Sequence, residues 1–254
     1  MVLFCFYGSG MEIPFELKSL EHAVRYQGWV SRTVAPFLGA RIMEIGAGIG
    51  NLSRHLPIRE RLILTELDPE LLKVLENRYA QLHSGNSKFT ISRLDLLNDD
   101  LEPYRAENLD TIVSFNVLEH LEDDRAAVRR LCDLLRGSKA SGPKRLISFV
   151  PAHQWAYGSM DKAFGHFRRY SAASISSLFR EAAPEARANV RYFNAFGLGG
   201  WLVNGRVLKR SSIGMDAIRG FETLCPFLSP IDDFCHKKLK LPFGQSLLAV
   251  LEWE

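Results

Sequence analysis

The chain has 254 residues, of which 46% are hydrophobic and 24% charged, with a formal net charge of +3. This composition is typical of a globular protein and argues against a disordered chain. The mildly basic balance lacks the dense positive stripe of a dedicated nucleic-acid-binding protein, so we expect no nucleic acid as partner. No run reaches the roughly 18 to 20 uncharged apolar residues of a membrane-spanning helix, which leaves at most peripheral membrane contact.

The amino-terminal segment, residues 1–11, is apolar but has no cationic start and only a short hydrophobic stretch. We therefore expect a flexible or docked segment and not a secretory signal. The cysteines have neither a paired spacing nor the spacing of zinc ligands, which predicts buried thiols, no metal site and a reducing cytoplasmic location. They are Cys5, Cys132, Cys225 and Cys235.

Apolar periodicity predicts the first elements in chain order. Residues 16–37 have a helical period with one irregularity near Gly28, and strands then alternate with helices as far as residue 150. The expected strands are 41–45, 61–66, 88–94, 109–115 and 144–150, and the expected helices are 49–56, 69–82 and 122–136. This alternation is typical of an α/β fold with a Rossmann-like, doubly wound sheet.

The alternation ends after Pro151, where an aromatic and polar loop leads to a helix that begins at Ser171. A strand-like stretch over 188–197, a long cap segment and a final apolar strand over 246–253 follow. Four glycines between Gly197 and Gly205 argue against one regular helix there. We expect one domain with a cap insertion between late strands. Its expected parts are a helical segment 11–40, a cofactor-binding core 41–150, a substrate-side loop and cap 151–243, and a final strand 244–254.

The stretch RIMEIGAGIGN, residues 41–51, runs from an apolar strand into a turn with three alternate glycines. Glycine permits positive backbone dihedrals and the close approach of a ligand to the main chain, so this glycine loop predicts a nucleotide-type cofactor. Dinucleotide-binding loops have the spacing G-x-G-x-x-G, whereas Glu44 here precedes alternate glycines. A carboxylate at this point repels a pyrophosphate but can receive an ammonium group. The helix expected from Ile49 would point its free amides into the same crevice.

Acidic residues follow the next two expected strands. Glu66 ends the second strand about 20 residues after the first glycine, the distance at which an acid meets ribose hydroxyls in sheets of this class. Asp68 is a second candidate, although it could serve only as the N-cap of the next helix. Asp95 follows the third strand and could equally start a turn.

The fourth strand ends in SFNVLEH, residues 114–120. With the glycine loop and the strand-end acids, this motif resembles class I methyltransferases, whose cofactor is S-adenosylmethionine. The resemblance covers residues 41–136 and implies a seven-stranded sheet with an antiparallel last strand. Asp95 and Leu96 would contact the adenine, and Asn116 and Val117 the sulfonium side. The full expected cofactor set is Glu44, Gly46, Ala47, Gly48, Gly50, Glu66, Leu67, Asp95, Leu96, Asn116 and Val117.

Residues 151–171, with the pattern P-A-H-x-x-x-Y-G-x-x-D-x-x-x-G-H-x-R-R-Y-S, resemble a subgroup of bacterial methyltransferases of types 11 and 12. A histidine suits the removal of an acceptor proton, and His120 is the first candidate unless it only holds its loop. Asp161 could pair with His166 as acid and base, or with Arg169 to fix the loop. The expected catalytic residues are His120, His166 and Asp161, and the expected acceptor contacts are His153, Tyr157, Arg168, Arg169 and Tyr170.

We therefore expect S-adenosylmethionine-dependent methyl transfer to a small-molecule, glycan-like or lipid-linked acceptor. Residues 193–210 could rest on a bilayer, although a cap helix that packs its own core is favoured. A nicotinamide-dependent oxidoreductase would need G-x-x-G spacing without the leading acid, and a non-catalytic cofactor-binding module is a further alternative. The acceptor's identity and the oligomeric state stay open.

Overall fold

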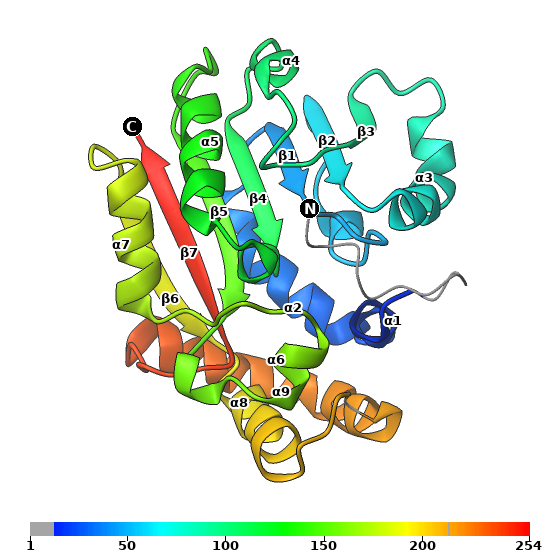
Figure 1. The fold of residues 1–254 in the computed structure, drawn as a ribbon, viewed down its shortest axis with the longest axis vertical. Coiled ribbons are helices and arrows are strands. Elements are labelled where there is room, and N and C mark those ends of the chain that lie inside the picture. Colours follow the sequence, from blue (N-terminus) through cyan, green and yellow to red (C-terminus); the bar gives the residue numbers. More distant parts are fainter. Residues whose placement is uncertain (1–12, 213) are drawn as a thin grey trace.

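The computed structural model describes residues 13–212 and 214–254. The expectations for the amino-terminal segment and for Cys5 lie outside these residues. The sheet has seven strands in the order β3-β2-β1-β4-β5-β7-β6 (Figure 1). Neighbouring strands are parallel from β3 to β5, whereas β7 runs antiparallel to β5 and β6. The expected doubly wound sheet with an antiparallel last strand is confirmed.

The observed strands lie within two residues of those expected in the cofactor-binding core. They are β1 (Arg41–Ile45), β2 (Arg61–Glu66), β3 (Phe89–Arg93), β4 (Thr111–Phe115), β5 (Lys144–Pro151), β6 (Arg187–Phe193) and β7 (Ser246–Trp253). The α-helices are α1 (Phe15–Glu21), α2 (Val24–Val34), α3 (Pro69–His83), α4 (Glu102–Arg105), α5 (Asp124–Arg136), α6 (Ser159–Ala163), α7 (Ala172–Ala182), α8 (Ala195–Leu202) and α9 (Met215–Lys238). Short 3-10 helices are η1 (Ala35–Phe37), η2 (Ser53–His55), η3 (Leu118–His120) and η4 (Gln154–Ala156), and η5 (Val203–Val207) is a π-helix.

The helix expected over 49–56 is wrong. Residues 48–52 form turns, and only the 3-10 helix η2 follows them. Gly48 and Gly50 have φ angles of 58° and 81°, which lie in the left-handed region and cannot belong to a right-handed helix. The glycine loop therefore presents separate turn amides to its surroundings instead of a helix terminus.

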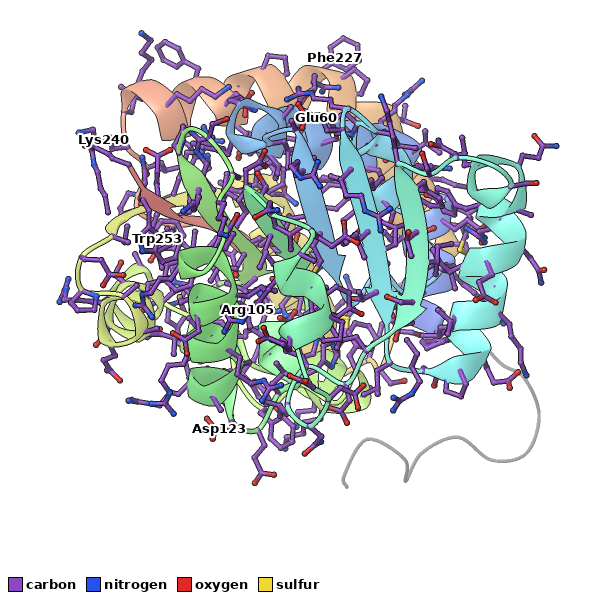
Figure 2. The ribbon with its side chains drawn as sticks, turned by 90° about the horizontal axis from the view of Figure 1, so that it is seen from above. Glu60, Arg105, Asp123, Phe227, Lys240 and Trp253 are labelled. Carbon is purple, nitrogen blue, oxygen red and sulfur yellow. The ribbon has the colours of Figure 1, made fainter. Side chains whose placement is uncertain are left out.

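The cap insertion lies between β6 and β7 and consists of α8, η5 and α9. In Figure 2, α9 extends along one side of the molecule, and Phe227 points away from the body of the protein. The change from α8 to a π-helix agrees with the expectation of no single regular helix in this glycine-rich stretch. The sequence did not predict α9, because Pro226 and Pro230 normally interrupt helices. Tertiary contacts hold it: the Asp232 carboxylate accepts hydrogen bonds from the amides of Asn194 (2.9 Å) and Ala195 (2.7 Å).

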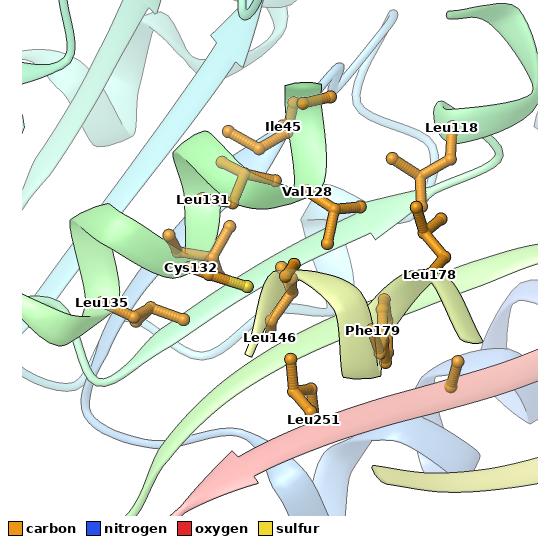
Figure 3. Packing of buried hydrophobic residues seen from close by; sticks show 14 of the residues in the cluster. Ile45, Leu118, Val128, Leu131, Cys132, Leu135, Leu146, Leu178, Phe179 and Leu251 are labelled. Carbon is orange, nitrogen blue, oxygen red and sulfur yellow. The ribbon is translucent and has the colours of Figure 1, made fainter. Parts of the chain in front are cut away.

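Helices cover both faces of the sheet, and one cluster of buried side chains lies on each face. On one face, α5 and α7 pack on the sheet; Figure 3 shows Leu146 between Leu131 of α5 and Leu251 of β7, with Phe179 of α7 at the same level. On the other face, Trp29 of α2 packs on Phe193 of β6 at a ring-centroid distance of 4.3 Å. This three-layer arrangement brings the carboxyl ends of β1, β2, β4 and β5 to one edge, where ligands bind in such sheets.

Cys132 and Cys225 are buried free thiols as expected, but Cys235 is only half-buried because it lies between the inner and outer faces of α9. Among the helices in the described ranges, none combines the length and apolar character needed to cross a bilayer.

Candidate active site

The glycine loop follows β1 at the carboxyl edge of the sheet. A β-carbon on Gly46 would lie 2.7 Å from Cγ2 of Val117, and one on Gly50 would lie 2.6 Å from the Tyr79 ring. Both glycines also have positive φ angles. Side chains at these positions would be strained and would collide with neighbouring elements, so the backbone can take this path only with glycine.

Glu44 lies at the base of this loop and is 2% exposed. Its Oε2 atom has no hydrogen-bond partner among the described residues. Burial raises the pKa of the carboxyl group to about 8, and the nearby charge of Glu66 acts in the same direction. A buried acid with an unused oxygen is stabilised by an approaching cation or donor. The position therefore fits the ammonium group of an amino-acid moiety.

Glu66 ties the end of β2 to the glycine loop. Its Oε2 accepts a hydrogen bond from the Gly48 amide at 2.7 Å, and its Oε1 accepts from the amides of Leu67 (2.8 Å) and Asp68 (3.0 Å). The Asp68 carboxylate in turn accepts from the amides of Glu70 and Leu71 at the start of α3. The N-cap interpretation of Asp68 is confirmed, and Glu66 is the strand-end acid in direct contact with the loop.

The ends of β3 and β4 supply the remaining expected cofactor residues. Asp95 forms a turn, since its carboxylate accepts from the amides of Leu97 (3.1 Å) and Asn98 (3.2 Å), while Leu96 is buried. Asn116 is exposed with a φ angle of 52°. Asp95 thus has the turn role that the sequence left open, and any contact with adenine would be additional.

Sequence reasoning missed the part of α1 that covers the glycine loop. The Leu17 carbonyl accepts a hydrogen bond from Nδ2 of Asn51 at 2.8 Å. The Leu17 side chain lies 3.3 Å from the point that a β-carbon on Gly48 would occupy. Periodicity predicted a helix in this region, but nothing local in the sequence indicates that it folds back over the loop.

The three expected catalytic residues lie in one cluster. Oδ1 of the fully buried Asp161 lies 2.9 Å from Nδ1 of His166. The rings of His166 and His120 meet edge to face with centroids 4.7 Å apart. Burial, assisted by the neighbouring His166, lowers the pKa of His120 to about 3, so its imidazole is neutral near pH 7.

A buried ion pair fixes the loop that carries His166. Nε of Arg169 donates to Oδ1 of Asp161 at 2.7 Å, and its Nη1 donates to the Ala152 carbonyl at 2.9 Å. The guanidinium also lies over the Trp201 ring, 4.3 Å from the centroid. Because these contacts occupy Arg169 inside the protein, we assign it a structural role in place of the expected acceptor contact.

Three more of the expected acceptor contacts also hold this loop. The Tyr170 hydroxyl donates to Oδ2 of Asp124 at 2.7 Å, and Nη1 of Arg168 lies 2.9 Å from the same oxygen. The Tyr157 hydroxyl donates to the His166 carbonyl at 2.6 Å. Tyr170 is buried, which assigns it to the architecture, whereas Arg168 and Tyr157 are half-buried and stay predicted acceptor contacts.

His153 takes part in a different set of contacts. Its ring stacks on Tyr192 of β6 at 4.9 Å, and its Nε2 accepts from the Gly244 amide at 3.4 Å. These contacts join the ends of β5, β6 and β7. The structure therefore does not bring His153 into the cluster of His120 and His166, and its expected acceptor contact is replaced by a packing role.

Glu119, His120 and His166 offer one ligand atom each, and these atoms lie within 4.8 Å of one another. Two imidazoles and one carboxylate are a ligand set that zinc and other transition metals use. The sequence predicted no metal from the spacing of its cysteines, and Glu119 and His166, which belong to separate elements, have no recognisable ligand spacing. The cluster thus has two possible uses, proton transfer and metal binding.

Comparison with known proteins finds similarity to methyltransferases. Residues 43–137 match the family model of a methyltransferase domain. The chain is 31% identical over 109 residues to the ubiquinone biosynthesis O-methyltransferase of Xanthomonas axonopodis pv. citri, covering 42% of this chain and 43% of that protein. A putative sarcosine dimethylglycine methyltransferase from Galdieria sulphuraria has a TM-score of 0.54 at 15% identity, over 90% of this chain and 84% of that one. The N-methyltransferase NodS from Bradyrhizobium japonicum WM9 was solved with S-adenosyl-l-homocysteine. It has a TM-score of 0.50 at 15% identity, over 95% of this chain and 88% of that one.

These matches agree with the strand order and the glycine loop. Residues 43–137 resemble a methyltransferase domain, and the fold of the whole chain is similar to that of solved methyltransferases. The chain spans less than half the length of the curated relatives that it matches. The acceptor and the use of the cap therefore have to be argued from this chain's own residues.

Proposed function

We propose that this protein is an enzyme that transfers a methyl group from S-adenosylmethionine to the oxygen of a small-molecule acceptor, which includes glycan-like and lipid-linked molecules. The observation that carries the proposal is the buried Glu44, with its unused oxygen, beneath a glycine loop that excludes side chains. The bound S-adenosyl-l-homocysteine in NodS and the name O-methyltransferase of the Xanthomonas relative support the cofactor and the kind of acceptor.

The residues around the glycine loop fit this cofactor. Glu44 would receive its amino group, and Glu66 its ribose hydroxyls, because a carboxylate accepts two hydrogen bonds from a vicinal diol. By resemblance, Asp95 and Leu96 would line the adenine, and Asn116 and Val117 the sulfonium side. When bound, the cofactor supplies a methyl group that is already activated. The protein then has to orient the acceptor and remove its proton.

We assign proton removal to His166 rather than to His120, the first candidate from the sequence. An ionised carboxylate only accepts hydrogen bonds, so Nδ1 of His166 donates to Asp161 and Nε2 keeps a free lone pair. The proton that leaves the acceptor oxygen moves to this Nε2, and Asp161 stabilises the resulting imidazolium. His120, with its pKa lowered to about 3 by burial, is a weak base and serves as a neutral neighbour that orients the acceptor.

Localisation in the cytoplasm is part of the proposal, since Cys132, Cys225 and Cys235 are free thiols. Metal binding is the second candidate function of the His166 cluster, favoured by the ligand atoms of Glu119, His120 and His166. We prefer proton transfer because an activated methyl donor needs no metal to make it electrophilic.

The proposal is tested by incubating the protein with labelled S-adenosylmethionine and fractionated cell extract. We expect a labelled product with the wild type and with His22→Ala, whose histidine is exposed on the surface. We expect little or no product with His166→Ala, although that variant should bind S-adenosylhomocysteine normally. Full transfer by His166→Ala would remove His166 from the mechanism. Failure of the wild type to bind S-adenosylhomocysteine would overturn the function itself.

A further inference from the structure

The cap carries most of the exposed apolar surface of the described residues. Fourteen large hydrophobic side chains are exposed, and ten of them belong to residues 196–243. Four of these ten lie on α9, and we call them the apolar stripe: Leu224, Phe227, Ile231 and Phe234. Their exposed fractions range from 53% to 71%. Scattered single apolar residues are normal on a surface, but a continuous group of this kind marks an interaction site.

The spacing of the apolar stripe places it on one face of α9. Residues separated by three, four and three positions lie above one another on a helix. The buried residues of α9, Cys225, Ser229, Asp232 and His236, lie on another face and contact the protein. Figure 2 shows Phe227 of the stripe directed outward. The stripe is therefore not part of any core in the described structure.

Polar contacts at two points prevent α9 from turning its apolar stripe inward. The Glu222 carboxylate accepts hydrogen bonds from the amides of Arg25 (2.8 Å) and Tyr26 (2.9 Å) at the start of α2. Asp232 binds the amides that begin the cap, as described above. Rotation of α9 would break these bonds and leave both carboxylates without their backbone partners, which is costly for the more buried Asp232. The outward direction of the stripe is thus built into the fold.

The cap surface is basic as well as apolar. Residues 203–243 contain seven Lys or Arg against four Asp or Glu. Of the four acids, Glu222 and Asp232 are bound to backbone amides, and Asp233 pairs with Lys237 at 2.9 Å. Lys238 lies one helical turn after Phe234 on the same face, and neither it nor Lys240 has an acidic partner in the part of the chain that the structure describes. The occupant of this face should accordingly be apolar and negatively charged.

The cap also contacts the loop that carries the proposed base. Trp201 of α8 packs on Arg169, which holds Asp161. Farther along, the Ser159 hydroxyl donates to the Gly205 carbonyl at 3.0 Å, and Arg206 donates to the Trp155 carbonyl at 2.8 Å. The α8 and η5 part of the cap therefore lies against the loop on the acceptor side of the protein.

We propose that the apolar stripe, with Lys238 and Lys240 at its end, binds the surface of a membrane that contains anionic lipids. The helix α9 lies parallel to the surface, with its stripe in the boundary between headgroups and acyl chains and its lysines against the lipid phosphates. At such a surface the acceptor would be an amphipathic molecule, a conclusion that rests on the proposed function. Membrane binding itself does not require methyl transfer.

The test is sedimentation of the whole protein with lipid vesicles, followed by light scattering of the protein alone. We expect vesicles with about one-third phosphatidylglycerol to bind it at least tenfold more tightly than vesicles of phosphatidylcholine, and added salt to weaken the binding. The double variant F227S/F234S should bind about tenfold less tightly or not at all. The matched control V24S/L82S removes two exposed apolar side chains outside the cap and should bind like the wild type.

Equal thermal unfolding of both double variants would show that they are folded. Absence of vesicle binding, equal binding to neutral and anionic vesicles, or an equal loss in the control would overturn the proposal. A concentration-dependent dimer that F227S/F234S abolishes, without vesicle binding by the wild type, would assign the stripe to a second copy and overturn it also. Vesicle binding without cofactor binding would leave this proposal standing and remove the proposed function.

Discussion

Asp161 and His166 form a buried carboxylate–imidazole pair, with Oδ1 of Asp161 2.9 Å from Nδ1 of His166. Arg169 and the Gly158 amide bind the same carboxylate, at 2.7 Å and 2.8 Å. The carboxylate therefore cannot move without breaking an ion pair, and the ring is held in one tautomer and one orientation. Such a fixed pair is how proteins position an imidazole for proton transfer.

From this pair we predict separate effects on turnover and on cofactor binding. His166→Ala should lower turnover by about 10² to 10⁴-fold, the usual contribution of a positioned base, and Asp161→Asn should lower it as well. Titration with S-adenosylhomocysteine should give unchanged affinity, because the glycine loop is intact in both variants. Normal turnover in His166→Ala, or a loss of cofactor affinity that matches the loss of turnover, would show that the pair only supports the fold.

The raised pKa of Glu44 predicts that the stability of the protein depends on pH. Its pKa is raised from 4.5 to about 8, so the folded state binds this proton more strongly than the unfolded state does. The resulting stabilisation is complete below about pH 4.5 and is lost as the pH rises through 8. Glu44→Gln should therefore unfold on the order of 5 °C above the wild type at pH 9, with little difference at pH 4.5. Thermal unfolding without cofactor measures the unfolding temperature of both proteins as a function of pH. A difference between them that is the same at pH 4.5 and pH 9 would contradict the prediction.

The glycine loop predicts a large difference between two glycine substitutions. Gly50→Ala should destabilise the protein by about 2 to 4 kcal/mol, because its β-carbon would strike Tyr79 in addition to the strain of positive φ. Gly85→Ala is the matched control, with a φ angle of 76° but no atom within 4 Å of the added carbon, and should cost only about 1 kcal/mol. Chemical denaturation compares them, and equal losses would mean that collision with Tyr79 contributes nothing.

Local sequence signals predict the structure of the cofactor-binding core, but they do not predict the contacts of the substrate-side loop and cap. Strand periodicity, the Asp68 cap and the leading Glu44 are short-range signals, so strands and acids fell where expected. The error over 49–56 arose because an apolar period outweighed the positive φ that Gly48 and Gly50 adopt. Only the tertiary structure shows which side chains of the loop after β5 form hydrogen bonds and ion pairs inside the protein.

Long-range contacts explain the other omissions. From the sequence, Arg169 could contact the acceptor or pair with Asp161 to fix the loop, and the tertiary fold, with Trp201 over the guanidinium, favours the structural role for Arg169. The sequence did not predict helix α9, because its two prolines disfavour a helix locally. Contacts with α2 and with the start of the cap stabilise the helix in the folded protein.

Chelation distinguishes the two uses of the His166 cluster. If the cluster transfers a proton, dialysis against a chelator should leave turnover within about twofold of the untreated protein, because no step depends on an ion. Atomic absorption of the purified protein should then find no stoichiometric zinc, manganese or iron. Loss of turnover on chelation and its return with one of these ions would assign Glu119, His120 and His166 to a metal centre.

The central claim is that the loop from Glu44 to Gly50 binds S-adenosylmethionine, and calorimetric titration with S-adenosylhomocysteine and with NAD tests it most directly. We predict saturable binding of S-adenosylhomocysteine at one site per chain, weakened about tenfold or more in Glu44→Gln because the ammonium group loses its carboxylate partner. We predict no measurable binding of NAD. Tight binding of NAD without binding of S-adenosylhomocysteine would contradict the account.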